Sequence, residues 1–144
     1  MRPHGFILLG TLGLSLGLVS CGASKQNGCT ALINVVNSGL SELENGKQQA
    51  KNDPSQSTEL RLMADALEKA GAAAAQLELT VPELKAISLR YQAMARDLSK
   101  HARDVADAAE KKDNDKLQKA RGLLNETLKL EDPIVDDLNK FCAE

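Results

Sequence analysis

The sequence predicts an all-α protein whose folded part is an antiparallel, up-down-up-down four-helix bundle. Aliphatic side chains recur at steps of three and four residues through most of the chain, which is the spacing of one helix face. No stretch alternates apolar and polar residues as a half-buried strand does. The apolar stretches are separated by short polar turns, and short connections make successive helices antiparallel.

The first two predicted helices flank a turn at residues 53–57, where Ser55 and Ser57 are candidate N-caps. The first helix ends before Pro54 and has its apolar face on Leu32, Val36, Leu40, Leu43 and Ala50. The second has its apolar face on Leu60, Met63, Leu67, Ala70, Ala74 and Leu77. Its Ala-rich segment 70–75 should let a neighbouring helix approach closely.

The third predicted helix begins after Thr80 and extends to about Lys111. Thr80 and Glu83 have the spacing of a capping box, and Pro82 suits the first turn. Heptad spacing then places one apolar face on Leu84, Ile87, Tyr91, Met94, Leu98, His101, Val105 and Ala108.

The fourth predicted helix follows the polar turn 112–115, where Asp113 can cap it. Its apolar face consists of Leu117, Ala120, Leu124, Leu128, Ile134, Leu138 and Phe141. Pro133 interrupts this face, because proline lacks an amide donor and disfavours helical geometry at the preceding residue. We expect either a kink there or a short fifth helix that starts at Pro133 and is capped by Asp132.

The composition argues against nucleic-acid binding. The chain has 18 Lys and Arg against 20 Asp and Glu, a net charge of −2, with one Tyr, two Phe and no Trp. Such a chain lacks the basic surface and the stacking side chains of a nucleic-acid binder. The acid–base pairs Asp65–Lys69, Asp107–Lys111 and Asp136–Lys140 predict solvated helix faces with contacts between successive turns.

The amino terminus has the three parts of an export signal: Arg2, an apolar run over residues 6–19, and a small-residue site before Cys21. The run is shorter than the ~20 residues of a membrane-spanning helix. Leu18-Val19-Ser20-Cys21 resembles the lipobox of bacterial lipoproteins. The resemblance implies cleavage between Ser20 and Cys21, a diacylglyceryl group on the Cys21 thiol, and an acyl chain such as palmitate on its amine. The alternative is a plain secretory signal with a chance cysteine.

The same resemblance predicts where the protein resides. Gly22, rather than Asp, follows the cysteine, which favours a lipid-anchored protein of the outer membrane, facing the periplasm, over retention in the inner membrane. The predicted divisions are a signal peptide at 1–20, a lipidated cysteine with a short flexible linker at 21–28, and a helical domain at 29–144. Fully extended, the linker reaches at most ~25 Å.

Cys29 and Cys142 are candidates for a disulfide, because exported proteins oxidise paired thiols. Four antiparallel helices bring the two chain ends together, whereas three would separate them by a helix length, ~35 Å. A disulfide requires Cα atoms within ~7 Å, so the pair and the helix count support one another. Two unpaired thiols or an intermolecular bond remain as alternatives.

The sequence contains no recognisable catalytic constellation. His101 lies on the apolar face of the third helix, so its interpretation is a boundary histidine bonded to Asp97. The alternative is a haem-type site with Met63 or Met94, similar to the His/Met pair of four-helix cytochromes of the b type. No serine or cysteine has a nucleophile context, and the aspartates of the 112–115 turn lack the remainder of a calcium loop.

These observations predict a non-enzymatic envelope lipoprotein that binds or scaffolds a periplasmic protein, without cofactor, metal or nucleic acid. The alternative function is a small redox or ligand carrier using His101 and a methionine. Beyond the lipobox, Asp132-Pro133 and Asn139-Lys140-Phe141-Cys142 resemble the endings of uncharacterised small helical lipoproteins.

Overall fold

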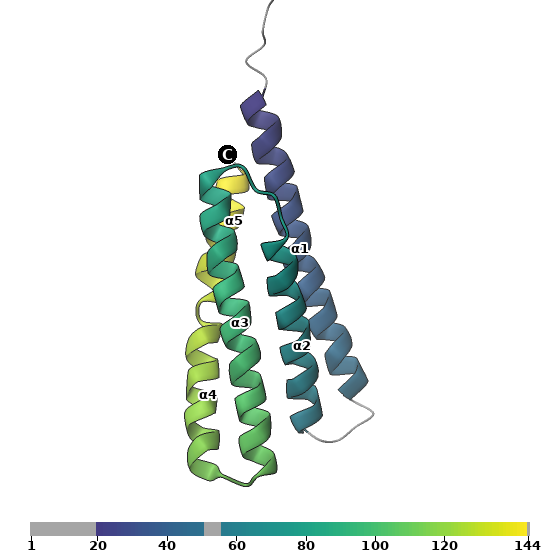
Figure 1. Cartoon of the computed structure of the whole chain (residues 1–144), viewed down its shortest axis with the longest axis vertical. Helices are drawn as coiled ribbons and strands as arrows, with labels where there is room; N and C mark the ends of the chain where they lie inside the picture. Colours follow the sequence, from purple (N-terminus) through teal and green to yellow (C-terminus); the bar gives the residue numbers. More distant parts are fainter. Residues whose placement is uncertain (1–19, 51–55, 144) are drawn as a thin grey trace, which may run out of the picture.

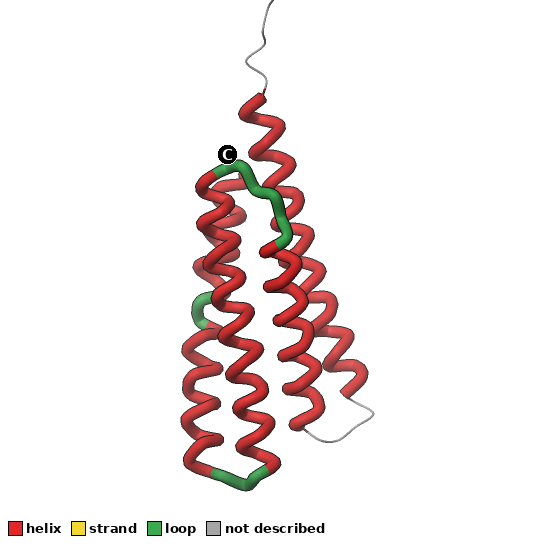
Figure 2. Tube along the Cα trace, in the orientation of Figure 1, coloured by secondary structure: helices red, strands yellow, loops and turns green. Residues whose placement is uncertain are grey.

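The structure is a computed structural model of the 144-residue chain, and it describes residues 20–50 and 56–143. These residues form helices and no strand, so the predicted all-α class is confirmed for them (Figure 2). The five helices are α1 (Ser20–Ala50), α2 (Gln56–Ala75), α3 (Pro82–Glu110), α4 (Asn114–Leu128) and α5 (Glu131–Ala143).

The helices pack around a central α2–α3 pair. α1 lies along α2, α4 lies along α3, and α5 contacts both α3 and α1. In Figure 1 the start of α1, the loop at 76–81 and the end of α5 lie toward one end of the molecule, and the turn at 111–113 lies at the other. A packed helical bundle is therefore present, with the end of α5 beside the first turns of α1.

The core is built from the predicted aliphatic faces. Leu32 of α1 and Leu84 of α3 are fully buried, and Leu67, Leu98 and Leu138 are nearly so. The Ala-rich end of α2 allows the expected close approach, because a Cβ added to Gly39 would lie 2.9 Å from the Cβ of Ala70. These contacts bring α1 and α2 into close apposition.

Residues 21–28, expected as a flexible linker, belong to α1 in the structure. Their sequence has low helix propensity, with glycines at 22 and 28. Tertiary contacts explain the difference. The hydroxyl of Ser24 bonds that of Thr80, and a Cβ on Gly28 would lie 2.7 Å from Cδ1 of Leu84. Packing against the bundle thus offsets a weak local preference.

The start of α3 differs from the predicted capping box. Val81, not Thr80, is the N-cap, and no side chain caps the helix. The Thr80 hydroxyl instead forms a hydrogen bond with the hydroxyl of Ser24. Pro82 occupies the first turn as predicted. Of the two cap candidates for α2, Ser57 lies inside the helix and Ser55 lies outside the described residues.

The start of α4 agrees with the prediction. Asp113 is the N-cap, and its carboxylate accepts a 3.1 Å hydrogen bond from the backbone N–H of Lys116. That bond is the main reason why the pKa of Asp113 lies below its usual value, and the Lys116 ammonium adds to the effect. Lys112 completes the turn with φ of 55°, a conformation that favours glycine.

A short fifth helix is present, but its start differs from the prediction. α4 ends at Leu128 and α5 begins at Glu131, before both Asp132 and Pro133. Pro133 therefore lies in the first turn of α5, where a missing N–H costs little because that turn has no intrahelical acceptor. The helix is interrupted at Lys129 and Leu130 rather than at Pro133.

None of the three predicted i,i+4 ion pairs forms between these described residues, and Asp65 and Asp107 instead pair with arginines of a neighbouring helix. Arg103 of α3 lies 2.8 Å from Asp65 and 2.6 Å from Glu68 of α2. Arg61 of α2 makes the reverse arrangement, 2.7 Å from Asp107 and 3.0 Å from Glu110 of α3. The longer arginine side chains reach across the α2–α3 interface, so the carboxylates of Asp65 and Asp107 bind there.

Candidate functional site

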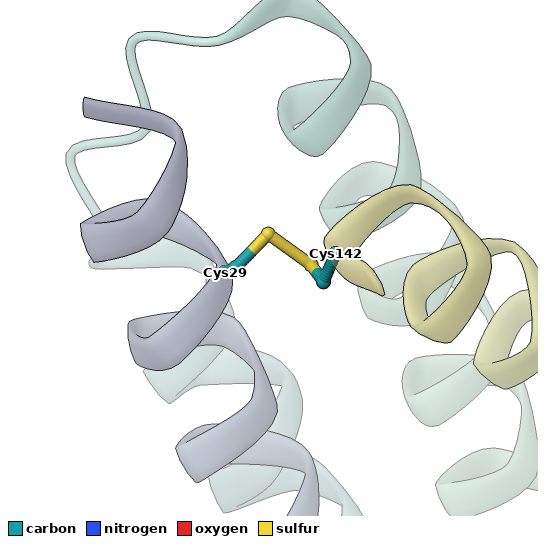
Figure 3. The surroundings of a disulfide bond; sticks show 2 residues. All are labelled: Cys29 and Cys142. Atoms are coloured by element: carbon teal, nitrogen blue, oxygen red, sulfur yellow. A yellow bond between two sulfur atoms is a disulfide. The ribbon is translucent and has the colours of Figure 1, made fainter. Parts of the chain in front are cut away.

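The two predicted cysteines are joined in the structure. Cys29 lies in the third turn of α1 and Cys142 near the end of α5, with their Cα atoms 5.7 Å apart (Figure 3). The bond links positions separated by 113 residues. It ties the helix that carries Cys21 to the last helix of the chain.

Further contacts surround this bond. We call the end of the bundle that contains the bond, the start of α1, the loop at 76–81 and the end of α5 the disulfide end. The ammonium of Lys25 lies 4.3 Å from the ring centroid of Phe141, a cation–π contact between α1 and α5. The Ser24–Thr80 bond adds the loop before α3. The first turns of α1 therefore contact two separate parts of the bundle, α5 and the loop before α3.

The predicted lipidation site lies at the start of α1. Ser20 and Cys21 are the first two residues of that helix. Their side chains, and all of residues 1–19, lie outside the described part of the chain. Cleavage after Ser20 and lipidation of Cys21 remain predictions.

The middle of the bundle contains an apolar opening, the α1–α4 groove. α1 and α4 make no extensive contact within the described residues, although each packs on its own neighbour. Val36, Leu40 and Leu43 of α1 line one side of the opening, Leu124 and Leu128 of α4 line the other, and Met63 and Met94 form its floor. Leu40 and Leu128 remain 48% and 43% exposed. Both were predicted as core residues, and they are exposed because none of the described helices covers this side.

The groove is narrow at its base. Its enclosed volume is about 60 Å³, well below the roughly 300 Å³ at which small-molecule pockets begin. Tyr91 and Glu131 supply its polar atoms. Burial raises the pKa of the Tyr91 phenol above its usual value, and the Glu131 carboxylate adds to the rise. The phenol therefore stays neutral at physiological pH, and the groove is suited to apolar side chains rather than to a bulky cofactor.

His101 does not join this groove, nor does it bond Asp97 as predicted. Its side chain is 14% exposed, and its Nδ1 atom lies 3.8 Å from a carboxylate oxygen of Asp104. Nδ1 is buried without a hydrogen-bond partner. Asp97 contacts Arg96 instead. Met63 and Met94 line the groove without His101, so the geometry does not favour the His/Met alternative.

Two further properties of the described residues bear on function. No group of three or more His, Cys, Asp or Glu side chains in them could hold a metal ion. None of the described helices combines the length and the apolar character needed to cross a membrane.

Comparison of the chain with protein-family models, with curated proteins and with solved structures finds no match. The candidate site is therefore defined by its own geometry. It consists of the disulfide-linked end near Cys21 and of the apolar α1–α4 groove in the middle of the bundle.

Proposed function

We propose that this protein is a lipid-anchored module of the bacterial cell envelope that binds or scaffolds a periplasmic protein without catalysing a reaction. The anchor is the lipidated Cys21, and the membrane is the outer membrane, with the module facing the periplasm. The body of the module is an up-down-up-down bundle in which α4 and α5 together act as the fourth member. The observation that carries the binding role is the α1–α4 groove.

Several features support a protein partner over a small ligand. Half-exposed leucines at the rim and methionines at the floor form a surface suited to an amphipathic helix. Methionine side chains adapt readily to the shape of what they contact. The small enclosed volume leaves little room for a compact molecule, whereas apolar side chains of a helix can cover Leu40 and Leu128 from outside.

The anchor is tested by metabolic palmitate labelling in a bacterial host that processes lipoproteins. We expect the native chain to incorporate label and to fractionate with outer membranes. The Cys21→Ala variant should lose both properties, because it has no thiol for the diacylglyceryl group. Equal membrane association of the two chains would contradict the proposed anchor.

The binding role is tested by photo-cross-linking in native membranes, followed by mass spectrometry. A photoreactive residue in place of Leu40 should capture one periplasmic protein reproducibly. The matched control places it at Leu89, which is 63% exposed on α3 and does not line the groove. Leu40→Asp should abolish co-purification of that protein while Leu89→Asp does not. Equal capture from both positions would contradict the groove as the binding surface.

A further inference from the structure

We propose that α1 is a rigid stalk that holds the disulfide end of the bundle against the bilayer surface and directs the turn at 111–113 away from it. The inference deepens the proposed function and rests on its lipid anchor at Cys21. It concerns the surface that the bilayer contacts, which a flexible linker would leave undefined.

The first support is the continuity of α1. The helix extends over 31 residues from Ser20 to Ala50, so Cys21 and Cys29 belong to one helix. At 1.5 Å per residue they are separated by about 12 Å along the helix axis. An extended linker over 22–28 could instead reach up to about 25 Å and could point in any direction. The helix therefore holds Cys21 closer to Cys29 than an extended linker would, and it fixes the direction in which Cys21 lies from the bundle.

The second support is that the stalk is held to the bundle at successive positions. Ser24 bonds Thr80, and Lys25 covers the ring of Phe141. Gly28 allows Leu84 to approach so closely that an added Cβ would lie 2.7 Å from Cδ1 of Leu84. The Cys29–Cys142 bond closes the series. A linker over residues 22–28 that moved freely would not make the contacts of Ser24, Lys25 and Gly28.

The third support is the shape of the molecule at this end. In Figure 1 the start of α1 extends beyond the other helices, and the loop at 76–81 and the end of α5 lie beside it. A bilayer that receives the lipid of Cys21 therefore meets this end first. The turn at 111–113 lies farther away by about the length of α3, whose 29 residues span about 43 Å.

The charge at the disulfide end matches a neutral membrane surface. Lys25, Lys85 and Lys140 are largely offset by Glu78 and Glu83 on the neighbouring loop and helix start. A surface with so small an excess of positive charge gains little from anionic lipid. The contact should therefore form on zwitterionic phosphatidylcholine as well as on anionic vesicles.

Hydrogen exchange tests the stalk directly. The lipidated full-length protein is placed in phosphatidylcholine vesicles and the amides of residues 25–28 are followed. We expect them to exchange at least about tenfold more slowly than an unstructured chain, because they are hydrogen-bonded within α1. Exchange at the unstructured rate, in protein that remains bound to the vesicles, would overturn the inference.

Energy transfer to headgroup-labelled lipid tests the orientation. A donor attached in place of Glu78 should transfer at least roughly twofold more than one in place of Lys111, since these sites are separated by about the length of α3. Equal transfer from the two positions would overturn the inference. The same measurement on anionic vesicles should give an unchanged ratio, and a ratio that depends on anionic lipid would contradict the charge argument.

Two matched variants distinguish the effect of the helical backbone at residues 24–27 from the effect of the native side chains there. Replacing residues 24–27 with four glycines should remove the amide protection and reduce the difference in energy transfer, because glycine disfavours helix. Four alanines at the same positions keep the helix and should retain both readouts. A native transfer ratio in the glycine variant would overturn the stalk. Failure of the lipid anchor gives a different result, since native and Cys21→Ala chains would then associate equally with membranes.

Discussion

Gly39 and Gly122 are both helical glycines, but they occupy opposite environments. A Cβ on Gly39 would lie 2.9 Å from the Cβ of Ala70 and 3.0 Å from the hydroxyl of Tyr91, whereas a Cβ on Gly122 would meet nothing within 4 Å. Gly39→Ala should destabilise the protein by roughly 1–3 kcal/mol through overpacking. Gly122→Ala should stabilise it by up to about 1 kcal/mol through helix propensity. Urea denaturation of both variants measures the two effects.

If the two alanine variants were stabilised alike, the close approach of α1 to α2 at Ala70 would be wrong. A shared loss of stability would instead mean that Gly122 is covered. The pair thus separates a packing effect from a propensity effect within one protein.

The N-cap at Asp113 should make the stability of the protein depend on pH in the acid range. Because the backbone N–H of Lys116 holds the pKa of Asp113 below its usual value, its contribution to stability is present above the unfolded-state pKa. That contribution is lost as the pH falls through the lower, folded-state pKa. Asp113→Asn keeps a capping oxygen that does not titrate. Thermal melting should show Asp113→Asn close to the native protein at low pH, with the native advantage growing from there to pH 6.

Asp113→Ala serves as the control for this comparison. It removes the cap at every pH, so it should melt below the asparagine variant across the whole range. A constant difference between the native chain and Asp113→Asn from pH 2 to 6 would contradict the role assigned to the ionised carboxylate.

At the scale of the helices, arginines join α2 and α3. Arg103 contacts both Asp65 and Glu68 of the neighbouring helix, while Arg96 of the same helix pairs with its neighbour in sequence, Asp97. Because the Arg103 side chain is 38% exposed, we expect Arg103→Ala to cost only about 0.2–1 kcal/mol, the range of surface ion pairs. Arg96→Ala should cost less. Denaturation at low and high salt measures both variants.

Salt supplies the internal control for the arginine prediction. The effect of Arg103→Ala should shrink as ionic strength rises, because salt screens exposed charges. A penalty that is unaffected by salt would indicate that the aliphatic stem of Arg103, rather than its charge, joins the helices.

The helix boundaries illustrate which local signals are decisive. The cap at Asp113 was predictable, because the side chain and the N–H that it accepts from are three residues apart. The capping box at Thr80 did not form, since Val81 is the N-cap, and the Thr80 hydroxyl bonds Ser24, which is distant in sequence. The linker prediction for 22–28 failed because the contacts of Gly28 and Lys25 come from α3 and α5.

At the scale of the whole molecule, one disulfide bond makes most of the chain into a covalent loop. The Cys29–Cys142 disulfide spans 113 residues, and loop-closure entropy gives such a bond an upper stabilisation of about 5 kcal/mol. We expect the Cys29→Ser, Cys142→Ser double variant to lose roughly 2–5 kcal/mol in guanidinium denaturation. A reductant should destabilise the native chain similarly and leave the double variant unchanged. A native chain that is unaffected by the reductant would contradict the intramolecular bond.

The α1–α4 groove also belongs to this scale. Leu40 and Leu128 have the spacing of core residues, and nothing in their local sequence distinguishes them from Leu32 or Leu138, which are buried. Their exposure follows from the break at Lys129 and Leu130, beyond which α5 rather than α4 contacts α1. The groove could not be predicted from periodicity, because periodicity identifies an apolar face but not what covers it.

The amino-acid sequence by itself determined the all-helical class, the main helices and the resemblance to a lipobox, because these depend on residue spacing along one segment. It also predicted the pairing of Cys29 with Cys142, since antiparallel helices bring the chain ends together. Only the tertiary structure decided that α1 continues through residues 22–28, that α4 and α5 separate before Pro133, and that a groove opens between α1 and α4. Each of these depends on contacts between segments far apart in the chain, whose energies outweigh the weak preferences of short stretches.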